Sequence, residues 1–156
     1  MAQVQGQGRV KINGQIIESA CTISAEDVYQ SIFLGEIPLR TLNVDGKGPL
    51  KTFFLHLINC NLDKGLDNKH WRDALVTFDG MTAGNSLFAV QGEAKGIAIR
   101  ILDANHQTAV VGESMNTIEL EPNTTTLKYQ LQLVKNKNVL KAGEFFSIIK
   151  FMIYYQ

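Results

Sequence analysis

The side chains that could perform catalysis are few and scattered along the sequence. His56 falls inside an apolar stretch between Phe54 and Ile58, whereas His70 and His106 stand in polar segments typical of loops or turns. The sequence contains no HExxH, HxxxH or GxSxG motif and no glycine-rich phosphate loop. These histidines therefore do not predict a catalytic centre, and His56 is expected to be structural or surface-facing.

Metal-binding and thiol chemistry have equally little support. Asp63, Asp67 and Asp73 could offer carboxylates to calcium, but their spacing fits no EF-hand pattern. Cys21 and Cys60 are too few for a zinc site without a CxxC pair, and their spacing to the histidines does not favour a Cys–His hydrolase. We expect no catalytic residues, no metal and no cofactor, hence no enzyme. From the residues alone, it stays open whether the two cysteines are free buried thiols.

The composition is that of an ordinary globular domain. Of 156 residues, 45% are hydrophobic and 19% charged, and 15 basic residues balance 15 acidic ones. Zero net charge argues against a general nucleic-acid or anionic-membrane binder, and no apolar run is long enough for a membrane span. Residues 1–6 lack the basic and apolar regions of a signal peptide, so the chain is either cytosolic or the mature form of an exported protein.

Alternation of apolar and polar residues is the main structural pattern. No window shows a helical period over three turns, and turn-forming clusters separate short apolar segments. This pattern predicts an all-β sandwich of seven or eight strands. The predicted strands include residues 28–34, 53–58, 75–78, 87–90, 96–102, 127–134 and 143–156.

The final strand is apolar on both faces. One face carries Phe145, Ile149, Phe151, Ile153 and Tyr155, and the other carries Phe146, Ile148, Met152 and Tyr154. Such a strand is expected to be covered on both sides, yet no further strand follows it in the sequence. An apolar strand at a sheet edge is a pairing hazard, so another segment must cover it.

The opposite end of the chain has a complementary pattern. Residues 3–13 alternate strictly, with glutamine, arginine, lysine and asparagine side chains on one face. The other face is small or apolar: Val4, Gly6, Gly8, Val10 and Ile12, followed by Gly14. Glycines weaken a free-standing strand. This segment is therefore suited to a groove that requires close backbone approach.

Together these motifs resemble the pilin subunits of the chaperone–usher pathway, most closely the structural pilins of P-pilus and type 1 kinds. The resemblance spans essentially the whole chain and ends on the penultimate Tyr155, a hallmark of the family. The matching motifs are Gly8-Arg9-Val10-Lys11-Ile12-Asn13-Gly14 with Ala20-Cys21, Phe53-x-Leu55-x-Leu57-x-x-Cys60, Val76-x-Phe78-x-Gly80, Gly96-Ile97-x-Ile99-x-Ile101-x-Asp103, Gly143, and Phe151-x-Ile153-x-Tyr155-Gln156.

The resemblance implies an incomplete immunoglobulin-like sandwich that lacks its last strand and is completed by a donor strand from another chain. It divides the sequence into an N-terminal donor-strand extension (1–14) and a pilin domain (15–156). It further implies a structural subunit of an adhesive fimbria outside the bacterial cell. A periplasmic chaperone would deliver the subunit to an outer-membrane usher, where neighbouring pilin subunits exchange donor strands.

Roles for individual residues follow from the same resemblance. Cys21 and Cys60 would form the family's disulfide bond, in an oxidising compartment. The donor strand would present Val4, Gly6, Gly8, Val10, Ile12 and Gly14. The acceptor groove, which is also the chaperone-binding surface, would be formed by Phe145, Ile149, Phe151, Ile153, Tyr155 and Gln156, with the Gln156 carboxylate held by basic residues of the chaperone.

Two departures from the family pattern bear on the alternatives. Phe145 and Ile149 are bulky where family members usually carry small residues, which leaves open a chain-terminating or adaptor subunit with a blocked groove. A receptor-binding adhesin is a further alternative, against which the donor extension argues. The unusually apolar face of Met152 and Tyr154 suggests packing against a neighbouring subunit in a coiled rod.

Overall fold

The computed structural model describes residues 6–64, 69–84, 86–136 and 139–156. Strands dominate these residues, which confirms the predicted all-β class, and neither helix in them is long and apolar enough to cross a membrane. The elements in chain order are β1 (Thr22–Ile23), α1 (Ala25–Val28), α2 (Leu39–Asp45), β2 (Lys47–Cys60), β3 (Asp73–Asp79), β4 (Thr82–Gly84), β5 (Leu87–Ala89), β6 (Gln91–Gly92), β7 (Ile97–Asp103), β8 (Ile118–Glu119), β9 (Asn123–Lys135), β10 (Phe145–Phe146) and β11 (Lys150–Tyr155).

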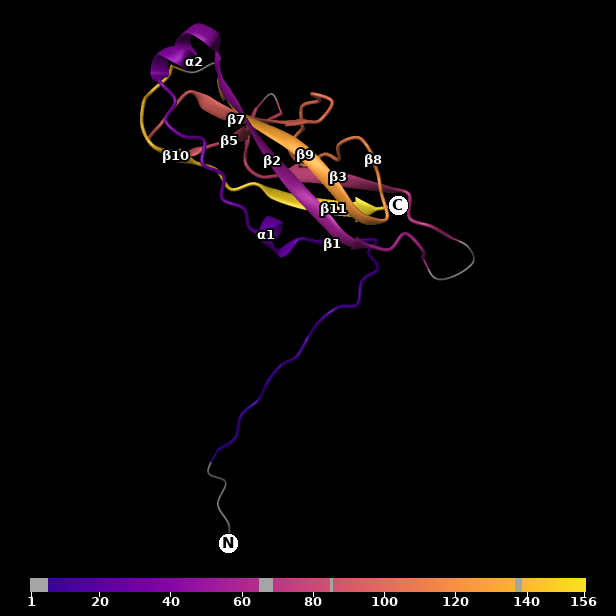
Figure 1. Ribbon diagram of the computed structural model, residues 1–156. Coiled ribbons are helices and arrows are strands. Elements are labelled where there is room, and N and C mark those ends of the chain that lie inside the picture. Colours follow the sequence, from indigo (N-terminus) through magenta and orange to yellow (C-terminus); the bar gives the residue numbers. More distant parts are fainter. Residues whose placement is uncertain (1–5, 65–68, 85, 137–138) are drawn as a thin grey trace.

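The larger layer is a six-stranded antiparallel sheet in the order β1-β2-β9-β7-β5-β4. Its centre is the long pair β2 and β9, which lie side by side through the middle of the molecule (Figure 1). In β9 the alternation from Leu127 through Tyr129 and Leu131 to Leu133 places four buried side chains on one face. This face covers the core, and the strand itself was predicted over residues 127–134.

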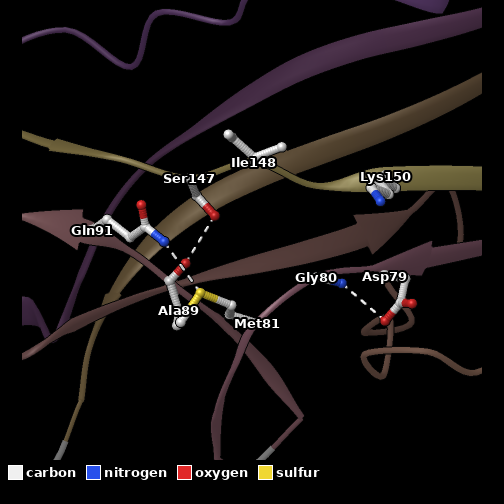
Figure 2. Close-up of a pocket in the computed structure, with 8 residues that line it drawn as sticks. All are labelled: Asp79, Gly80, Met81, Ala89, Gln91, Ser147, Ile148 and Lys150. Carbon is white, nitrogen blue, oxygen red and sulfur yellow. Dashed lines mark hydrogen bonds between the residues drawn. The ribbon is translucent and has the colours of Figure 1, made fainter.

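The second layer is made of two small sheets, β11-β3-β8 and β10-β6. The terminal segment passes from one to the other: β10 pairs with β6, and β11 pairs with β3. At the crossing, the Ser147 hydroxyl donates to the Ala89 carbonyl oxygen at 2.8 Å (Figure 2). Gly143 permits the approach to β6, because a Cβ there would lie 2.7 Å from the Cβ of Glu93.

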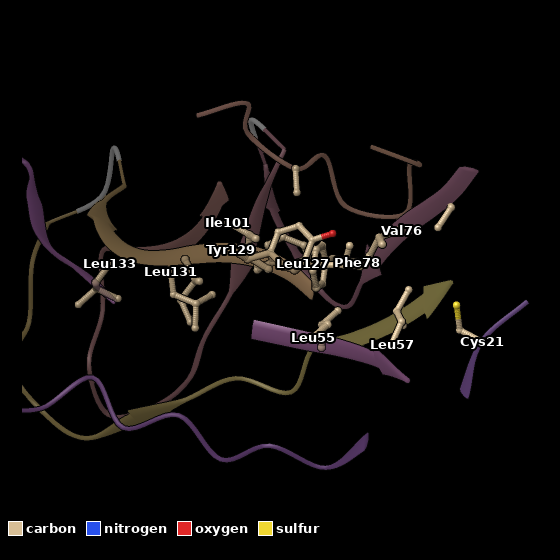
Figure 3. Packing of buried hydrophobic residues seen from close by; sticks show 14 of the residues in the cluster. Cys21, Leu55, Leu57, Val76, Phe78, Ile101, Leu127, Tyr129, Leu131 and Leu133 are labelled. Atoms are coloured by element: carbon tan, nitrogen blue, oxygen red, sulfur yellow. The ribbon is translucent and has the colours of Figure 1, made fainter. Parts of the chain in front are cut away.

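Aromatic contacts join the two layers across the core. The Tyr129 ring of β9 meets the Phe78 ring of β3 edge-on, with centroids 4.9 Å apart, and stacks on Phe53 of β2 at 5.5 Å. Figure 3 shows Phe78 and Tyr129 packed with leucines of β2 and β9 and with Val76 of β3. The core therefore lies between the sheets, as in a sandwich.

Residues 6–19 lie outside this core. All of them are exposed, and the segment extends away from the domain (Figure 1). Burial begins at Ala20 and Cys21, which belong to the core cluster. The exposed segment ends at residue 19, five residues beyond residue 14, where the donor-strand extension was predicted to end.

The strand predicted over residues 28–34 is not formed. Ala25–Val28 is helical instead, and residues 29–37 belong to no strand. Residues 32, 33 and 34 still alternate between half-buried and exposed, as in a strand. Within the described residues, the segment lacks a neighbouring strand to complete its backbone hydrogen bonds.

Candidate functional site

The C-terminal strand β11 is paired along one edge only. Its six residues pair with β3 in unbroken antiparallel register, from Lys150 opposite Asp79 to Tyr155 opposite Ala74. Among the described residues, no strand pairs with its other edge. The outward-pointing N–H and C=O groups of that edge therefore lack strand partners, and such an edge readily pairs with another chain.

The two faces of the terminal segment differ in burial. Phe145, Ile149, Phe151, Ile153 and Tyr155 are half-buried and pack against the core. The opposite face is exposed, contrary to the expectation that both faces would be covered: Phe146 (53%), Ile148 (73%), Met152 (39%) and Tyr154 (53%). The difference arises because the adjacent layer packs on the inward face alone.

A second unpaired backbone edge is formed by residues 30–37. No backbone hydrogen bond from these residues is present in the described part of the chain. Ile32, Leu34 and Ile37 pack partly against the core, whereas Phe33 is 81% exposed. The side chains thus fix one face of the segment, while its backbone groups have no protein partner.

The two unpaired edges, residues 30–37 and the outer edge of β11, belong to neighbouring segments. The views in Figures 1 and 3 both show the segment between α1 and α2 running beside the terminal segment. No backbone hydrogen bond joins the two within the described residues. An extended strand between them could pair with both edges and cover the half-buried apolar side chains.

The N-terminal segment presents its predicted apolar side chains to solvent. Val10 is 85% exposed and Ile12 is 89% exposed. A Cβ placed on Gly6, Gly8 or Gly14 would meet no atom within 4 Å, so none of these glycines is required by packing in this chain. Val4, the other residue predicted for this face, lies outside the described residues.

The two cysteines form a disulfide bond. Cys21 precedes β1, Cys60 ends β2, and the bond spans 39 positions in the sequence. Closing a loop of about 40 residues corresponds to roughly 4 kcal/mol in the chain-entropy model. The bond thereby ties the first residues of the folded domain to the central sheet, and the free-thiol alternative is wrong.

The end of the chain is hydrogen-bonded to Asp73, the first residue of β3, and to Arg72, which precedes this strand. The Gln156 backbone oxygen accepts from the N–H groups of Arg72 (2.7 Å) and Asp73 (3.0 Å). Tyr155 adds an edge-on contact with Trp71, with ring centroids 6.1 Å apart. These contacts anchor the end of β11 within its own chain.

A pocket of about 300 Å³ lies where the terminal segment crosses between the small sheets (Figure 2). It is lined on one side by Ser147, Ile148 and Lys150 and on the other by residues near Met81 and Gln91. Three of its polar side chains, Asp79, Gln91 and Ser147, bond within the chain; the Gln91 amide, for example, donates to the Met81 sulfur. In the described residues, no group of three or more ligand-type side chains could hold a metal ion.

This arrangement defines an all-β domain with unpaired edges and an exposed alternating segment, the features of a pilin. Comparison with protein families agrees: the chain matches the model described as "Fimbrial protein" over residues 10–156 and belongs to that family. Members of the family are structural subunits of fimbriae of the chaperone–usher pathway, which polymerise with other subunits into a surface pilus.

Individual relatives extend over most of the chain. The PRS fimbrial minor pilin protein of Escherichia coli is 36% identical over 151 residues, covering 96% of this chain and 77% of that protein. The PAP fimbrial minor pilin protein of Escherichia coli is 35% identical with the same coverage. The crystal structure of the P pilus rod subunit PapA superposes with a TM-score of 0.79 at 23% identity, over 88% of this chain and 100% of that chain. That likeness establishes the immunoglobulin-like pilin fold.

Proposed function

We propose that this fimbrial subunit polymerises by donor-strand exchange. The observation that carries the proposal is a pair of edges, residues 30–37 and the outer edge of β11, that lie side by side (Figure 1) and are unpaired within the described part of the chain. A strand inserted there from another subunit would complete both edges. We call the space between these edges the acceptor groove.

The donor strand is supplied by residues 3–14 of another copy or a related subunit. About ten extended residues span roughly 33 Å, enough to follow the whole of β11. Val10 and Ile12 on one face would enter the groove and contact the half-buried residues of the terminal strand. Gly6, Gly8 and Gly14 allow the backbone to approach closely, while Arg9 and Lys11 remain on the solvent side.

Before assembly, a periplasmic chaperone occupies the groove. The half-buried side chains from Phe145 to Tyr155 would leave an apolar surface in water, and the open edges would invite aggregation. The chaperone strand protects both and is replaced at the outer-membrane usher. Because one Gln156 oxygen is already bound by Arg72 and Asp73, a basic chaperone residue would use the other carboxylate oxygen.

The domain acts by assembly, not by catalysis. Cys21 and Cys60 are joined to each other and provide no nucleophile. His56 contacts Asp27, but among the described residues no hydroxyl or thiol nucleophile is hydrogen-bonded to this pair. The proposed product of the subunit is the extracellular fimbrium itself.

The direct test is peptide exchange. Purified chaperone-bound subunit is mixed with a synthetic peptide of residues 3–16, and release of the chaperone is followed by size-exclusion chromatography. Donor-strand exchange predicts release with formation of a stable subunit–peptide complex. Persistence of the chaperone complex at a large excess of peptide would contradict the proposal.

We also propose a minor position in the fimbria. The support is that both relatives described above, at 36% and 35% identity, are named minor pilins. Quantitative mass spectrometry of purified fimbriae tests this point. A minor subunit is expected at a few copies per filament, and a share equal to that of the main rod protein would contradict it.

A further inference from the structure

The chain leaves the edge of β2 at a defined point. Thr22 and Ile23 pair with Ile58 and Leu57, and the Ser24 N–H continues this pairing by donating to the His56 carbonyl oxygen at 2.9 Å. In a continued antiparallel strand, the Ser24 carbonyl would accept from the His56 N–H in return. It instead accepts from the N–H of Asp27 at 2.9 Å and starts the turn into α1.

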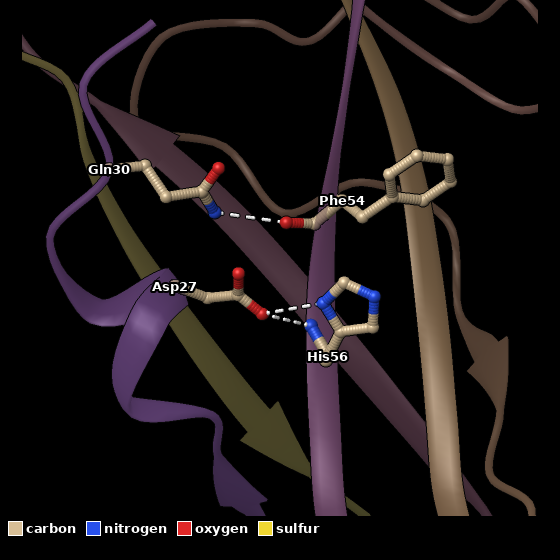
Figure 4. A network of polar contacts seen from close by, with 4 residues as sticks. All are labelled: Asp27, Gln30, Phe54 and His56. Carbon is tan, nitrogen blue, oxygen red and sulfur yellow. Dashed lines mark hydrogen bonds and ion pairs between the residues drawn. The ribbon is translucent and has the colours of Figure 1, made fainter.

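Two side chains replace the strand that turned away. One Asp27 carboxylate oxygen accepts from the His56 backbone N–H at 2.6 Å and from the ring Nδ1 at 2.9 Å. The Gln30 amide donates to the Phe54 carbonyl oxygen at 2.9 Å. Figure 4 shows both side chains reaching from α1 and the following residues to the edge of β2. We call this set of contacts the Asp27–Gln30 clamp.

The clamp is the main polar attachment of this part of the chain. A four-residue helix has no stability of its own, and the Ser24 side chain at its N-cap makes no capping hydrogen bond. Asp27 is only 7% exposed, so its carboxylate depends on the two donors of His56. Hydrogen bonds to a charged acceptor are stronger than those between neutral groups.

The clamp lies at the start of residues 30–37, the segment that forms one side of the acceptor groove. Residues 30–37 make no backbone hydrogen bond to any other described residue, so their position depends on their side-chain packing and on what fixes each end. One end is held by the clamp. At the other end the chain enters α2, where Leu42 is buried and the N–H of Gly46 closes the helix on the Leu42 carbonyl.

We infer that Asp27 and Gln30 are positioning residues for donor-strand binding. They substitute for strand pairing on β2 and thereby hold residues 30–37 beside β11 with room for one inserted strand. This inference rests on the proposed donor-strand exchange. If residues 30–37 occupy this position for only a fraction of the time, the apparent affinity for the incoming strand is reduced to that fraction of its full value.

The inference is tested with the full chain and a fluorescent peptide of residues 3–16. Asp27→Ala removes the acceptor for both donors, and Gln30→Glu keeps the shape but removes the donor to Phe54. Asp27→Asn retains an oxygen for the His56 N–H. Glu26→Ala is the matched control, because Glu26 is an exposed acidic neighbour on the same helix. Peptide affinity and hydrogen–deuterium exchange are measured for each protein.

Asp27→Ala and Gln30→Glu are expected to weaken peptide binding by about five- to tenfold. In the peptide complex, the amides of residues 30–37 should be less protected from exchange in these variants than in the unmodified chain, while β7 and β9 exchange at the unmodified rate. Asp27→Asn should restore part of the affinity, and Glu26→Ala should bind as the unmodified chain does.

Unchanged affinity in both clamp variants, or equally faster exchange in β7 and β9, would overturn the inference and leave donor-strand exchange intact. Failure of the unmodified chain to bind the peptide would overturn the proposed function, and the clamp's role with it.

Discussion

The Tyr155 hydroxyl lies 3.4 Å from the backbone carbonyl oxygen of Cys21 and donates to it. This contact joins the last strand to the residue that carries the disulfide, although 134 positions separate the two in the sequence. The start of the folded domain and the end of the chain are thus held together at one end of the acceptor groove. The penultimate tyrosine therefore has a structural role in this chain, apart from any contact with a partner.

Replacing Tyr155 with phenylalanine should cost a small amount of stability. The hydrogen bond is long and partly exposed, so we expect a loss of about 0.5–1 kcal/mol in the free energy of unfolding. Urea denaturation measures the change. Tyr154→Phe is the control, because the exposed Tyr154 hydroxyl contacts only the Met152 sulfur at 3.6 Å. Equal losses in the two variants would show that the contact with Cys21 has no special contribution.

Loss of the disulfide should be far more damaging. Replacing Cys21 and Cys60 together with alanine is expected to lower the free energy of unfolding by about 4 kcal/mol, the chain-entropy value for a loop of about 40 residues. Chemical denaturation of the oxidised and variant proteins gives the difference. A change below about 1 kcal/mol would mean that the unfolded chain is already compact in this region.

Stability should also decline in strongly alkaline solution. Burial, reinforced by the Asp103 carboxylate, raises the pKa of Tyr129, and burial raises the pKa of Tyr155. Above pH about 10, where an unperturbed tyrosine ionises, the unfolded chain loses these protons before the folded one. The contribution of both tyrosines to the free energy of unfolding is therefore complete below that pH and is lost progressively above it.

Tyr129→Phe tests this effect without disturbing the aromatic stack. The buried Tyr129 hydroxyl has no hydrogen-bond partner among the described residues, so its removal should leave stability at pH 7 unchanged or raise it by up to about 1 kcal/mol. The variant should also lose stability less steeply above pH about 10. A large loss at pH 7 would show that the hydroxyl does have a partner.

The sequence predicted the strands but not all of their partners. Alternation in residues 127–134 and 145–155 correctly indicated strands, because side-chain direction in a strand has a fixed period of two. The same rule failed for residues 28–34, since a strand also needs a neighbour, and the described part of the chain supplies none. The expectation that both faces of the terminal strand would be covered failed because the adjacent layer packs on its inward face alone.

The contacts of the clamp could not be predicted from the sequence. Asp27 and His56 are 29 positions apart, and nothing in their local patterns indicates that they meet. The disulfide was found through resemblance to a family and not from spacing alone. Long-range pairings of this kind depend on the fold, which places β1 beside β2.

The exposed apolar face of the terminal strand should matter in the assembled filament. Met152→Ser and Tyr154→Ser remove apolar surface that is 39% and 53% exposed in the isolated chain. If this face packs on a neighbouring subunit in a coiled rod, electron microscopy should show altered filaments while chaperone binding stays within about twofold. Thr77→Ser, a conservative change at a buried site in β3, serves as the control. Equal loss of filament form and chaperone binding would contradict this role.

If a single strand fits between residues 30–37 and β11, amide exchange should detect its insertion. The chain is labelled by hydrogen–deuterium exchange with and without the peptide of residues 3–16. A peptide carrying Val10→Asp, which would bury a charge in the groove, is the negative control; one carrying Arg9→Ala changes only the solvent-side face. We predict that the unmodified and Arg9→Ala peptides slow exchange in both residues 30–37 and 150–155. Exchange that is unaltered in either segment, or slowed elsewhere in the domain instead, would contradict the account.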